Sequence, residues 1–273
     1  MPQNGTGGYM KDIQMWENAP LLEEGGHVPY MTYFPAEGES DSALVIFAGG
    51  GYHHRAYHEG EGYAEYFSKL GMHCFVVHYR TNPYLFPVEL LDARRALRLV
   101  RASAAEYGIS EDKIAVIGSS AGGHLAALVS TYRDAIDGEG VDSVDEIDPI
   151  PNAQILCYPV LDPEGHLGSY ISLLGNADFK SKWRSVTPRY IADKNTPPCF
   201  MWHCEGDKVV DVLNTIKYSA RLAELGVSQE THIYPRGSHG VGLVTEERFA
   251  AHTYMQSWAP MAGNWLRLIG FIK

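Results

Sequence analysis

Residues 116–126 read VIGSSAGGHLA, and this stretch decides the fold because its character changes in the middle. Val116 and Ile117 end a β-branched run that is typical of a buried strand, whereas Leu125 and Ala126 belong to a stretch with helical spacing. Three glycines and two serines lie between the two parts. Such a turn either holds a nucleophile at its apex or only lets a helix pack closely on a sheet.

The flanking sequence favours the nucleophile. Residues 118–122, GSSAG, fit the pattern Gly-x-Ser-x-Gly with Ser120 at the centre. The run KIAVIG (113–118) predicts a strand and HLAALVSTYR (124–133) predicts a helix, which is the strand–turn–helix setting of a nucleophile elbow. We therefore expect Ser120 to be the nucleophile and Ser119 to be a turn or cap hydroxyl.

Strand-like and helix-like segments alternate along the rest of the chain. The apolar runs at 43–48, 73–79, 113–118, 154–160, 199–203 and 231–235 predict strands, and helical spacing marks 60–70, 88–107, 120–133, 211–225 and 246–269. This alternation predicts an α/β fold, a three-layer sandwich whose mostly parallel central sheet has helices on both faces. VPYMTYFP (28–35) is expected to add an antiparallel strand at one edge.

Two stretches break the alternation within what we expect to be one domain spanning residues 1–273. Residues 134–152, the acidic segment, carry seven acids without Lys or Arg after Arg133, which predicts a solvated loop; the spacing of a calcium loop is absent. Residues 162–196, the cap segment, are too long for a simple crossover and predict a small cap over the edge of the sheet.

A serine hydroxyl needs a base, and the base needs a residue that orients it. His239 follows the last strand-like run in GSHGVGL (237–243), the histidine loop, and Asp207 follows the preceding strand. The order Ser120, Asp207, His239 is the one expected for a nucleophile elbow of this kind. Asp162 and Asp211 are the competing acids, and Asp211 is better suited to capping a helix.

An ester or amide hydrolase also needs amide donors for the oxyanion of its intermediate. The glycine loop (Gly49–Gly51) follows a central strand, and we expect the amides of Gly50 and Gly51 to serve with that of Ala121. Tyr52 and Trp183 are candidates for substrate binding. His54 and His58 share a helical spacing that can bind a metal, but we expect them to line the pocket mouth or face solvent.

Composition limits the partners. The 22 basic and 33 acidic residues give a net charge of -11, which argues against a nucleic-acid partner. The first 16 residues contain no apolar segment of a signal peptide, and no apolar run approaches the ~20 residues of a membrane span. We therefore expect a cytoplasmic protein without a membrane partner, with a homo-oligomer left open.

Together these residues carry a resemblance to the α/β-hydrolase fold, within the esterase/lipase group that includes acetyl-xylan-esterase-like carbohydrate esterases. It rests on IQMWENAP, FAGGGY, HYR, FPVELLDARRAL, IGSSAGGHLA, YPVLD, TPPCFMWHCEGDKVV and GSHGVGL, which span most of the chain. Two positions depart from the group: Ala48 stands where its lipases carry histidine, and Asp211 stands where proline usually follows VV.

The resemblance implies a serine esterase that hydrolyses short-chain, first of all acetyl, esters of carbohydrates through an acyl-enzyme. It implies no cofactor and no metal, and a small-molecule or oligosaccharide ester as substrate. Two alternatives stay open at this point. One is an amidase or peptidase of the same fold, similar to formamidases and prolyl peptidases, and the other is a binding protein on a hydrolase scaffold.

Overall fold

The computed structural model describes residues 10–273. The expectation about a signal peptide concerns residues 1–16, of which residues 1–9 lie outside the described residues. In the described part, eight strands form one sheet. In chain order they are β1 (Lys11–Gln14), β2 (Tyr30–Phe34), β3 (Ala43–Phe47), β4 (His73–His78), β5 (Ile114–Ser119), β6 (Ala153–Cys157), β7 (Cys199–Cys204) and β8 (Gln229–Tyr234).

The strand order across the sheet is β1-β2-β4-β3-β5-β6-β7-β8. The pairs from β4 to β8 are all parallel, whereas β2 is antiparallel to both β1 and β4. The mostly parallel sheet is therefore confirmed. The antiparallel strand expected near residues 28–35 is present as β2, but the edge of the sheet is β1, which the sequence analysis missed.

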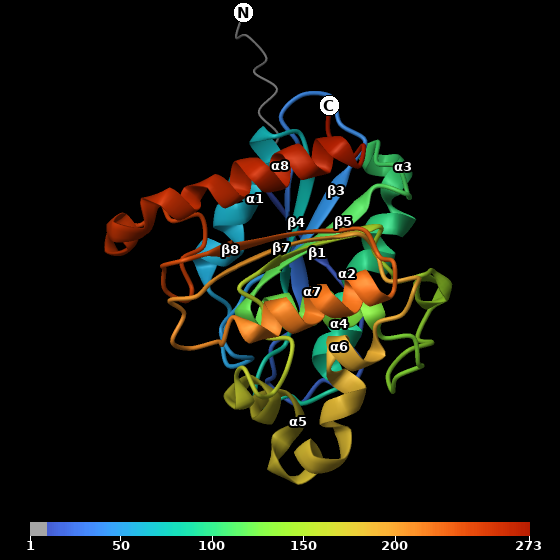
Figure 1. The fold of residues 1–273 in the computed structure, drawn as a ribbon. Helices are drawn as coiled ribbons and strands as arrows, with labels where there is room; N and C mark the ends of the chain where they lie inside the picture. The colour runs from blue at the N-terminus through green and yellow to red at the C-terminus, as the bar shows by residue number, and fades with distance from the viewer. Residues whose placement is uncertain (1–9) are drawn as a thin grey trace, which may run out of the picture.

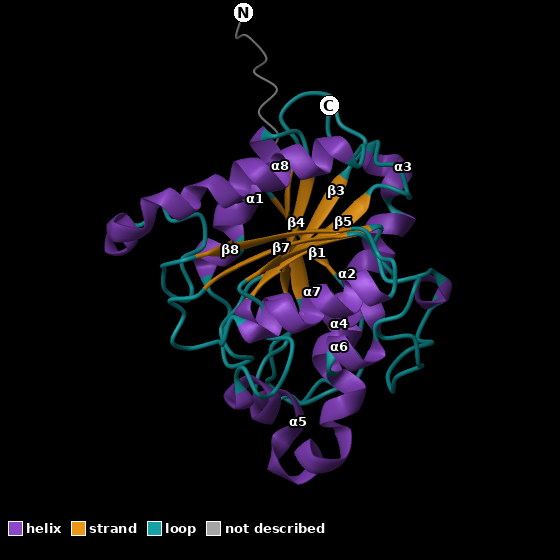
Figure 2. Ribbon diagram, viewed as in Figure 1, coloured by secondary structure: helices purple, strands orange, loops and turns teal. Residues whose placement is uncertain are grey.

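Helices cover both faces of the sheet and make three layers (Figures 1 and 2). The α-helices are α1 (Glu61–Lys69), α2 (Val88–Ala102), α3 (Ala104–Tyr107), α4 (Ser120–Thr131), α5 (Leu167–Lys182), α6 (Pro188–Ile191), α7 (Leu213–Glu224) and α8 (Trp258–Leu268). Short 3₁₀ helices are η1 (Tyr57–Glu59), η2 (Ser143–Glu146), η3 (Trp183–Val186) and η4 (Glu247–Ser257).

The core lies in two layers because strand side chains alternate between the faces of the sheet. In β3, Val45 and Phe47 pack with α2 and α4, whereas Leu44 and Ile46 pack with α1 and α8. All five residues of β3 are buried, as expected for a parallel strand covered on both sides. This central strand leads directly into the glycine loop.

The expected helix over residues 246–269 is wrong in its first half. Residues 247–257 form the 3₁₀ helix η4, and the α-helix begins at Trp258. Within η4 only Phe249 and Met255 are buried, and they lie six positions apart, so this part lacks the continuous apolar stripe of an amphipathic α-helix.

Five of the seven acids in the acidic segment are exposed, as its composition predicts, but three of the seven pair with arginines. Its carboxylates meet a row of arginines on α2: Glu139 lies 3.0 Å from Arg94, and Asp142 and Asp145 lie 2.6 and 3.2 Å from Arg95. Asp145 is buried. The row of acids and the row of arginines are far apart in sequence, so neither pattern by itself indicates that they pair.

The cap segment contains α5, η3 and α6 and projects at the bottom of Figure 1. Two hydrogen bonds fix it to the sheet layer. The backbone carbonyl of Val186 accepts from His124 of α4 at 2.8 Å, and the hydroxyl of Ser172 contacts Nε2 of His53, next to the glycine loop, at 2.8 Å. The cap segment is therefore attached to both elements that carry the candidate site.

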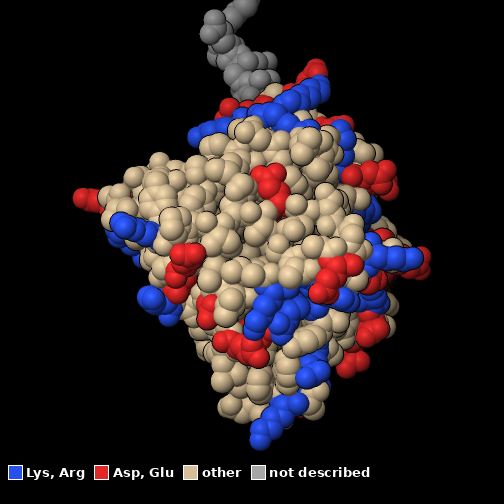
Figure 3. Space-filling view, viewed as in Figure 1, with Lys and Arg blue, Asp and Glu red and all other residues tan. Residues whose placement is uncertain are grey.

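On the face drawn in Figure 3, acidic and basic side chains are interspersed around a large central area of other residue types. No described helix has both the length and the apolar character that crossing a membrane requires.

Candidate active site

Ser120 lies at the turn between β5 and α4 in a conformation that few residues adopt. Its φ is +53°, in the left-handed region, and such a strained non-glycine residue is characteristic of functional sites. A Cβ on Gly118 would lie 2.1 Å from the carbonyl oxygen of Gly122, and one on Gly122 would lie 2.1 Å from that of Phe47. Both glycines are therefore required by the turn, which holds Ser120 with 8% of its surface exposed.

Three side chains predicted from the sequence form a continuous chain of hydrogen bonds. Oγ of Ser120 lies 2.7 Å from Nε2 of His239, and Nδ1 of His239 lies 2.7 Å from Oδ2 of Asp207. Because the carboxylate can only accept, His239 carries its proton on Nδ1 and leaves Nε2 free to accept the serine proton. This is the tautomer that a general base for Ser120 requires.

Asp207 is held in place by more than His239. Its Oδ1 accepts from the backbone N–H groups of Val209 and Val210, and His203 approaches Oδ2 at 3.1 Å. Burial by itself would raise the pKa of Asp207, but the hydrogen bonds from His203 and His239 outweigh it and hold the pKa well below its usual value. The group is therefore a carboxylate with a fixed orientation.

The competing acids are used elsewhere. Asp162 accepts from the N–H of Glu164 and forms an ion pair with Arg189 of α6. Asp211 accepts from the N–H of Leu213, the first residue of α7, although the N-cap position expected for Asp211 is held by Val212. Among these three acids, Asp207 is the one that contacts His239.

Ser119, the other serine of the turn, is fully buried in the layer beneath Ser120. Its Oγ lies 2.8 Å from the hydroxyl of Tyr63 on α1. Ser119 therefore serves packing and hydrogen bonding on the α1 side of the sheet, and its hydroxyl is turned away from the His239 contact that Ser120 makes.

The glycine loop lies against the nucleophile. A Cβ built on Gly49 would lie 3.1 Å from Cβ of Ser120, while Gly50 and Gly51 have positive φ values of +133° and +63°. The N–H of Gly49 donates to Glu59, so this amide is already used, and the predicted donors of the loop are the next two. Ala121 is the second residue of α4 and lies in its buried first turn, at the positive end of the helix. The role of these three amides stays a prediction.

A buried carboxylate that the sequence analysis missed connects the two loops of the site. Oε2 of Glu59 accepts from the N–H of Gly49 at 2.9 Å, and Oε1 accepts from the hydroxyl of Tyr158 at 2.6 Å. The same hydroxyl accepts from the N–H of Gly242 in the histidine loop at 2.9 Å. Glu59 is 2% exposed, so this clamp (Glu59 with Tyr158) fixes the glycine loop relative to His239 from inside the core.

The ring of Tyr158 also packs edge-to-face against His239, with ring centroids 5.1 Å apart. No local pattern marks this clamp, because Glu59 and Tyr158 lie 99 positions apart in the sequence. The one available signal is a glutamate in HEGEGY (58–63), just before the helix that follows the glycine loop.

Tyr52 does not line a substrate pocket, contrary to the prediction. It is 1% exposed, and its hydroxyl lies 2.6 Å from Nδ1 of His124 under the glycine loop. Its backbone, with φ of +65°, directs the ring into the core. Trp183 lies half-buried on the cap segment, edge-to-face with Tyr190, and its contact with substrate stays a prediction.

His54 and His58 do not form a metal site together. Nε2 of His58 lies 2.8 Å from the carbonyl oxygen of Gly240 in the histidine loop. Across residues 10–273, no three His, Cys, Asp or Glu side chains come together in a way that could hold a metal ion.

A mostly parallel sheet covered by helices, with a strained serine after a central strand and a histidine and an aspartate after later strands, defines the α/β-hydrolase fold. The chain matches the BD-FAE family model over residues 32–222. It therefore belongs to the BD-FAE family of α/β-hydrolase esterases.

Known relatives agree with this assignment. A solved acetyl ester-xyloside bifunctional hydrolase from Caldicellulosiruptor lactoaceticus is 36% identical, with a TM-score of 0.89 over 96% of this chain and 97% of that chain. Endo-1,4-beta-xylanase B of Butyrivibrio fibrisolvens is 31% identical over 82% of this chain, and an acetylxylan esterase of Xylanibacter ruminicola is 29% identical over 91%. This chain spans 36% and 50% of those two proteins, respectively.

Proposed function

We propose that this protein is a serine esterase that removes acetyl and other short acyl groups from carbohydrates, xylan-derived saccharides among them. The observation that carries the proposal is the hydrogen-bonded series Ser120–His239–Asp207, in which both contacts of His239 measure 2.7 Å. Two similar proteins support the carbohydrate part of the proposal: the acetylxylan esterase of Xylanibacter ruminicola and the acetyl ester-xyloside bifunctional hydrolase of Caldicellulosiruptor lactoaceticus.

The first half of the reaction forms an acyl-enzyme. Oγ of Ser120 attacks the carbonyl carbon of the ester while Nε2 of His239 takes the hydroxyl proton, and Asp207 stabilises the imidazolium that results. The carbonyl oxygen becomes an oxyanion, for which the amides of Gly50, Gly51 and Ala121 are the proposed donors. His239 then gives its proton to the departing sugar oxygen as the tetrahedral intermediate collapses.

The second half repeats these steps with water. His239 removes a proton from a water molecule, whose oxygen attacks the acyl carbon of the acyl-enzyme. Collapse of the second tetrahedral intermediate returns the proton from His239 to Oγ of Ser120 and releases the free acid. Every step uses side chains and amides of this chain.

The attachment of the cap segment supports a preference for short acyl groups. His124 is hydrogen bonded to Val186 of the cap segment, and His53 is hydrogen bonded to Ser172. Burial, followed by the nearby His239, lowers the pKa of His166, so this cap residue lies close to the catalytic histidine. A segment held at these points differs from a mobile apolar lid that opens for long chains. A lipase would gain up to about 0.8 kcal/mol for each methylene it buries.

The test is a series of kcat/KM values on p-nitrophenyl acetate, butyrate, octanoate and palmitate, together with acetylated xylotetraose and p-nitroacetanilide. We expect the acetate to be hydrolysed best, the acetylated saccharide to lose its acetyl groups, and the anilide to react poorly. Best turnover of octanoate or palmitate would contradict the short-chain proposal, and preferred cleavage of the anilide would indicate an amidase.

A further inference from the structure

A cavity lies next to the candidate active site, at the carboxyl ends of β3 and β4. It has a volume of about 420 Å³, and its walls come from the chain that follows the glycine loop, the end of β4 and the start of α1. Ligands of parallel α/β sheets bind at this edge, and the volume lies within the range of small-molecule sites.

This cavity shares a wall with the catalytic site. Ala48 lines the cavity, and the next residue, Gly49, packs against Ser120. The wall continues through His53 and His54, and the N–H of His54 is hydrogen bonded to the carbonyl oxygen of Gly50. A molecule in the cavity would therefore contact the chain that carries the predicted oxyanion donors.

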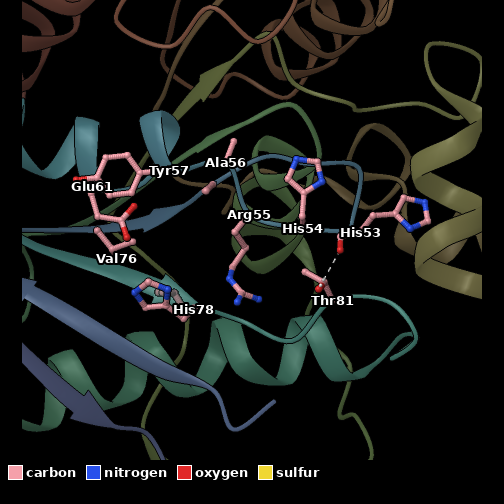
Figure 4. Close-up of a pocket in the computed structure, with 11 residues that line it drawn as sticks. His53, His54, Arg55, Ala56, Tyr57, Glu61, Val76, His78 and Thr81 are labelled. Atoms are coloured by element: carbon pink, nitrogen blue, oxygen red, sulfur yellow. Dashed lines mark hydrogen bonds between the residues drawn. The ribbon is translucent and has the colours of Figure 1, made fainter. Parts of the chain in front are cut away.

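The side chains that face the cavity offer both donors and acceptors. Figure 4 shows the guanidinium of Arg55 projecting into it near His78 and Thr81. One N–H of Arg55 donates to the carbonyl oxygen of Tyr79, and its other N–H groups have no hydrogen-bond partner in the described residues. The Glu61 carboxylate contacts the backbone N–H of its own residue and no other side chain by hydrogen bonding within residues 10–273, and it lines the cavity together with the His54 imidazole.

An aromatic ring stands at the rim. Tyr57 is 67% exposed, and its hydroxyl makes no hydrogen bond to the described residues, although a ring of this size normally buries much of its surface. An exposed aromatic ring beside polar side chains provides an apolar surface for one face of a ligand and hydrogen-bonding groups for its edges.

The charges of the cavity argue against an ionic ligand. Arg55 and Glu61 carry opposite charges, and burial, followed by the nearby Arg55, lowers the pKa of His78 to about 4, so that this ring is neutral at pH 7. No trio of metal-binding side chains exists in the described residues. A neutral ligand that is rich in hydroxyl groups and apolar on one face matches these lining groups, and a sugar ring has this character.

We propose that this cavity is a saccharide subsite that binds an unmodified sugar unit of the ester's alcohol part while an acetylated unit lies at Ser120. The inference rests on the proposed function and deepens it, because it assigns the recognition of the carbohydrate to residues on the far side of the glycine loop. Arg55 and Glu61 would bind hydroxyl groups, and Tyr57 would stack on the ring.

The test compares two substrates in each variant: acetylated xylotetraose and p-nitrophenyl acetate, which has no sugar. The measured quantity is the ratio of kcat/KM on the saccharide to kcat/KM on the nitrophenyl ester. We expect Tyr57→Ala and Glu61→Gln each to lower this ratio about tenfold. Tyr57→Phe, which keeps the ring, should retain most of it, and Glu65→Gln, one turn further along α1 on an exposed position, should leave it unchanged.

A second measurement observes binding alone. Ser120→Ala keeps the cavity and removes the nucleophile, so calorimetric titration of this variant with unacetylated xylotetraose reports binding without hydrolysis. We expect saturable binding that weakens about tenfold when Tyr57→Ala is added. Binding that Tyr57→Ala leaves unchanged would overturn the subsite.

The outcomes separate the two proposals. If wild-type protein hydrolyses p-nitrophenyl acetate but does not deacetylate the saccharide, the proposed carbohydrate function fails. If it deacetylates the saccharide and the substrate ratio is the same in Tyr57→Ala, Glu61→Gln and wild type, the function stands and the subsite is refuted.

Discussion

Two of the regions in which this protein buries polar side chains differ in how those side chains are arranged. Along α2, the guanidinium groups of Arg94 and Arg95 are each matched by carboxylates of the acidic segment. At the carboxyl edge of the sheet, the hydrogen bonds run in one direction, from Ser120 through His239 to Asp207. The first region neutralises charge in place, whereas the second leaves a hydroxyl poised to lose a proton.

The difference shows how burial serves two purposes in one chain. The arginine layer, which consists of Arg94 and Arg95 on α2 with their carboxylate partners, fixes a long surface segment. No non-glycine residue of α2 or of the acidic segment has a positive φ. The catalytic edge contains Ser120 at φ of +53° and a turn that tolerates only glycine on either side. We therefore expect changes in the first region to cost stability and changes in the second to cost activity.

Removal of the nucleophile should have the largest effect on activity and almost none on folding. Ser120→Ala is expected to lower kcat on p-nitrophenyl acetate by roughly 10⁴–10⁶, because no other group can form the acyl-enzyme, while the circular dichroism spectrum stays that of the wild type. Ser119→Ala should keep activity within about tenfold. Loss of activity in Ser119→Ala with survival of Ser120→Ala would mean that the elbow is misassigned.

The next largest effect is expected at the acid. Asp207→Asn should lower kcat by about 10³–10⁴, since an amide donating to Nδ1 of His239 would favour the tautomer that cannot accept the serine proton. Asp162→Asn and Asp211→Asn, whose carboxylates bind other groups, are the matched controls and should lose far less. An inactive Asp162→Asn beside an active Asp207→Asn would move the acid to the end of β6.

In the arginine layer the measured loss should be in stability. Arg95→Ala is expected to lower the free energy of unfolding by about 3 kcal/mol, because it leaves the buried Asp145 short of a partner, while kcat stays within about threefold. Lys113→Ala, which breaks the more exposed pair with Asp41, is the control and should cost less than about 1 kcal/mol in a urea titration. Equal losses in both variants would show that the buried pair of Arg95 and Asp145 stabilises the fold no more than an exposed pair does.

The clamp of Glu59 and Tyr158 shares a property with each region: it is buried like the arginine layer, and it contacts the loops that carry the catalytic groups. Glu59→Gln should lower kcat about 10–100-fold with little change in KM, because the amide cannot accept from both Gly49 and Tyr158. Tyr158→Phe should have a similar effect, and the double variant should lose less than the sum of the two.

The exposed Glu65→Gln is the matched control for the clamp and should behave as wild type. An additive double variant, or a KM change without a kcat change, would show that Glu59 and Tyr158 do not act together to position the loops.

The smallest expected effect is a pH dependence of stability from His124. Burial lowers its pKa from 6.5 to about 4, so the unfolded chain takes up the proton first as the pH falls. The stability that neutral His124 contributes is complete above pH 6.5 and is lost toward pH 4; between pH 6.5 and 5.5 the loss is on the order of 1 kcal/mol. His124→Gln should flatten this part of the profile in urea titrations, and an unchanged slope would contradict the assignment.

Sequence alone was informative where the determinants are local. The glycines around Ser120 and the change from strand to helix at the same point lie within a dozen residues, and both follow from the sterics of one turn. Asp207 and His239 could be proposed because each follows a strand, and parallel strands end at a common edge of the sheet.

Features that depend on the packing of distant segments could not be predicted in this way. Glu59 and Tyr158 meet only because η1 and the end of β6 are brought together below the glycine loop. Likewise, three carboxylates of the acidic segment pair with arginines that lie far away in the sequence, on α2. Tyr52 was expected at the surface of the site, but its own positive φ turns it toward His124. In each case the deciding contact comes from the tertiary structure.

The central claim is that Ser120, activated by His239, is the residue that forms the acyl-enzyme. The most direct test treats the wild-type protein with a fluorophosphonate and identifies the modified residue by fragmenting the peptide that contains residues 116–126. We predict one phosphonyl group per chain, located on Oγ of Ser120, with activity lost in proportion to labelling. A label on Ser119 or on another peptide, or full activity after complete labelling, would contradict the account.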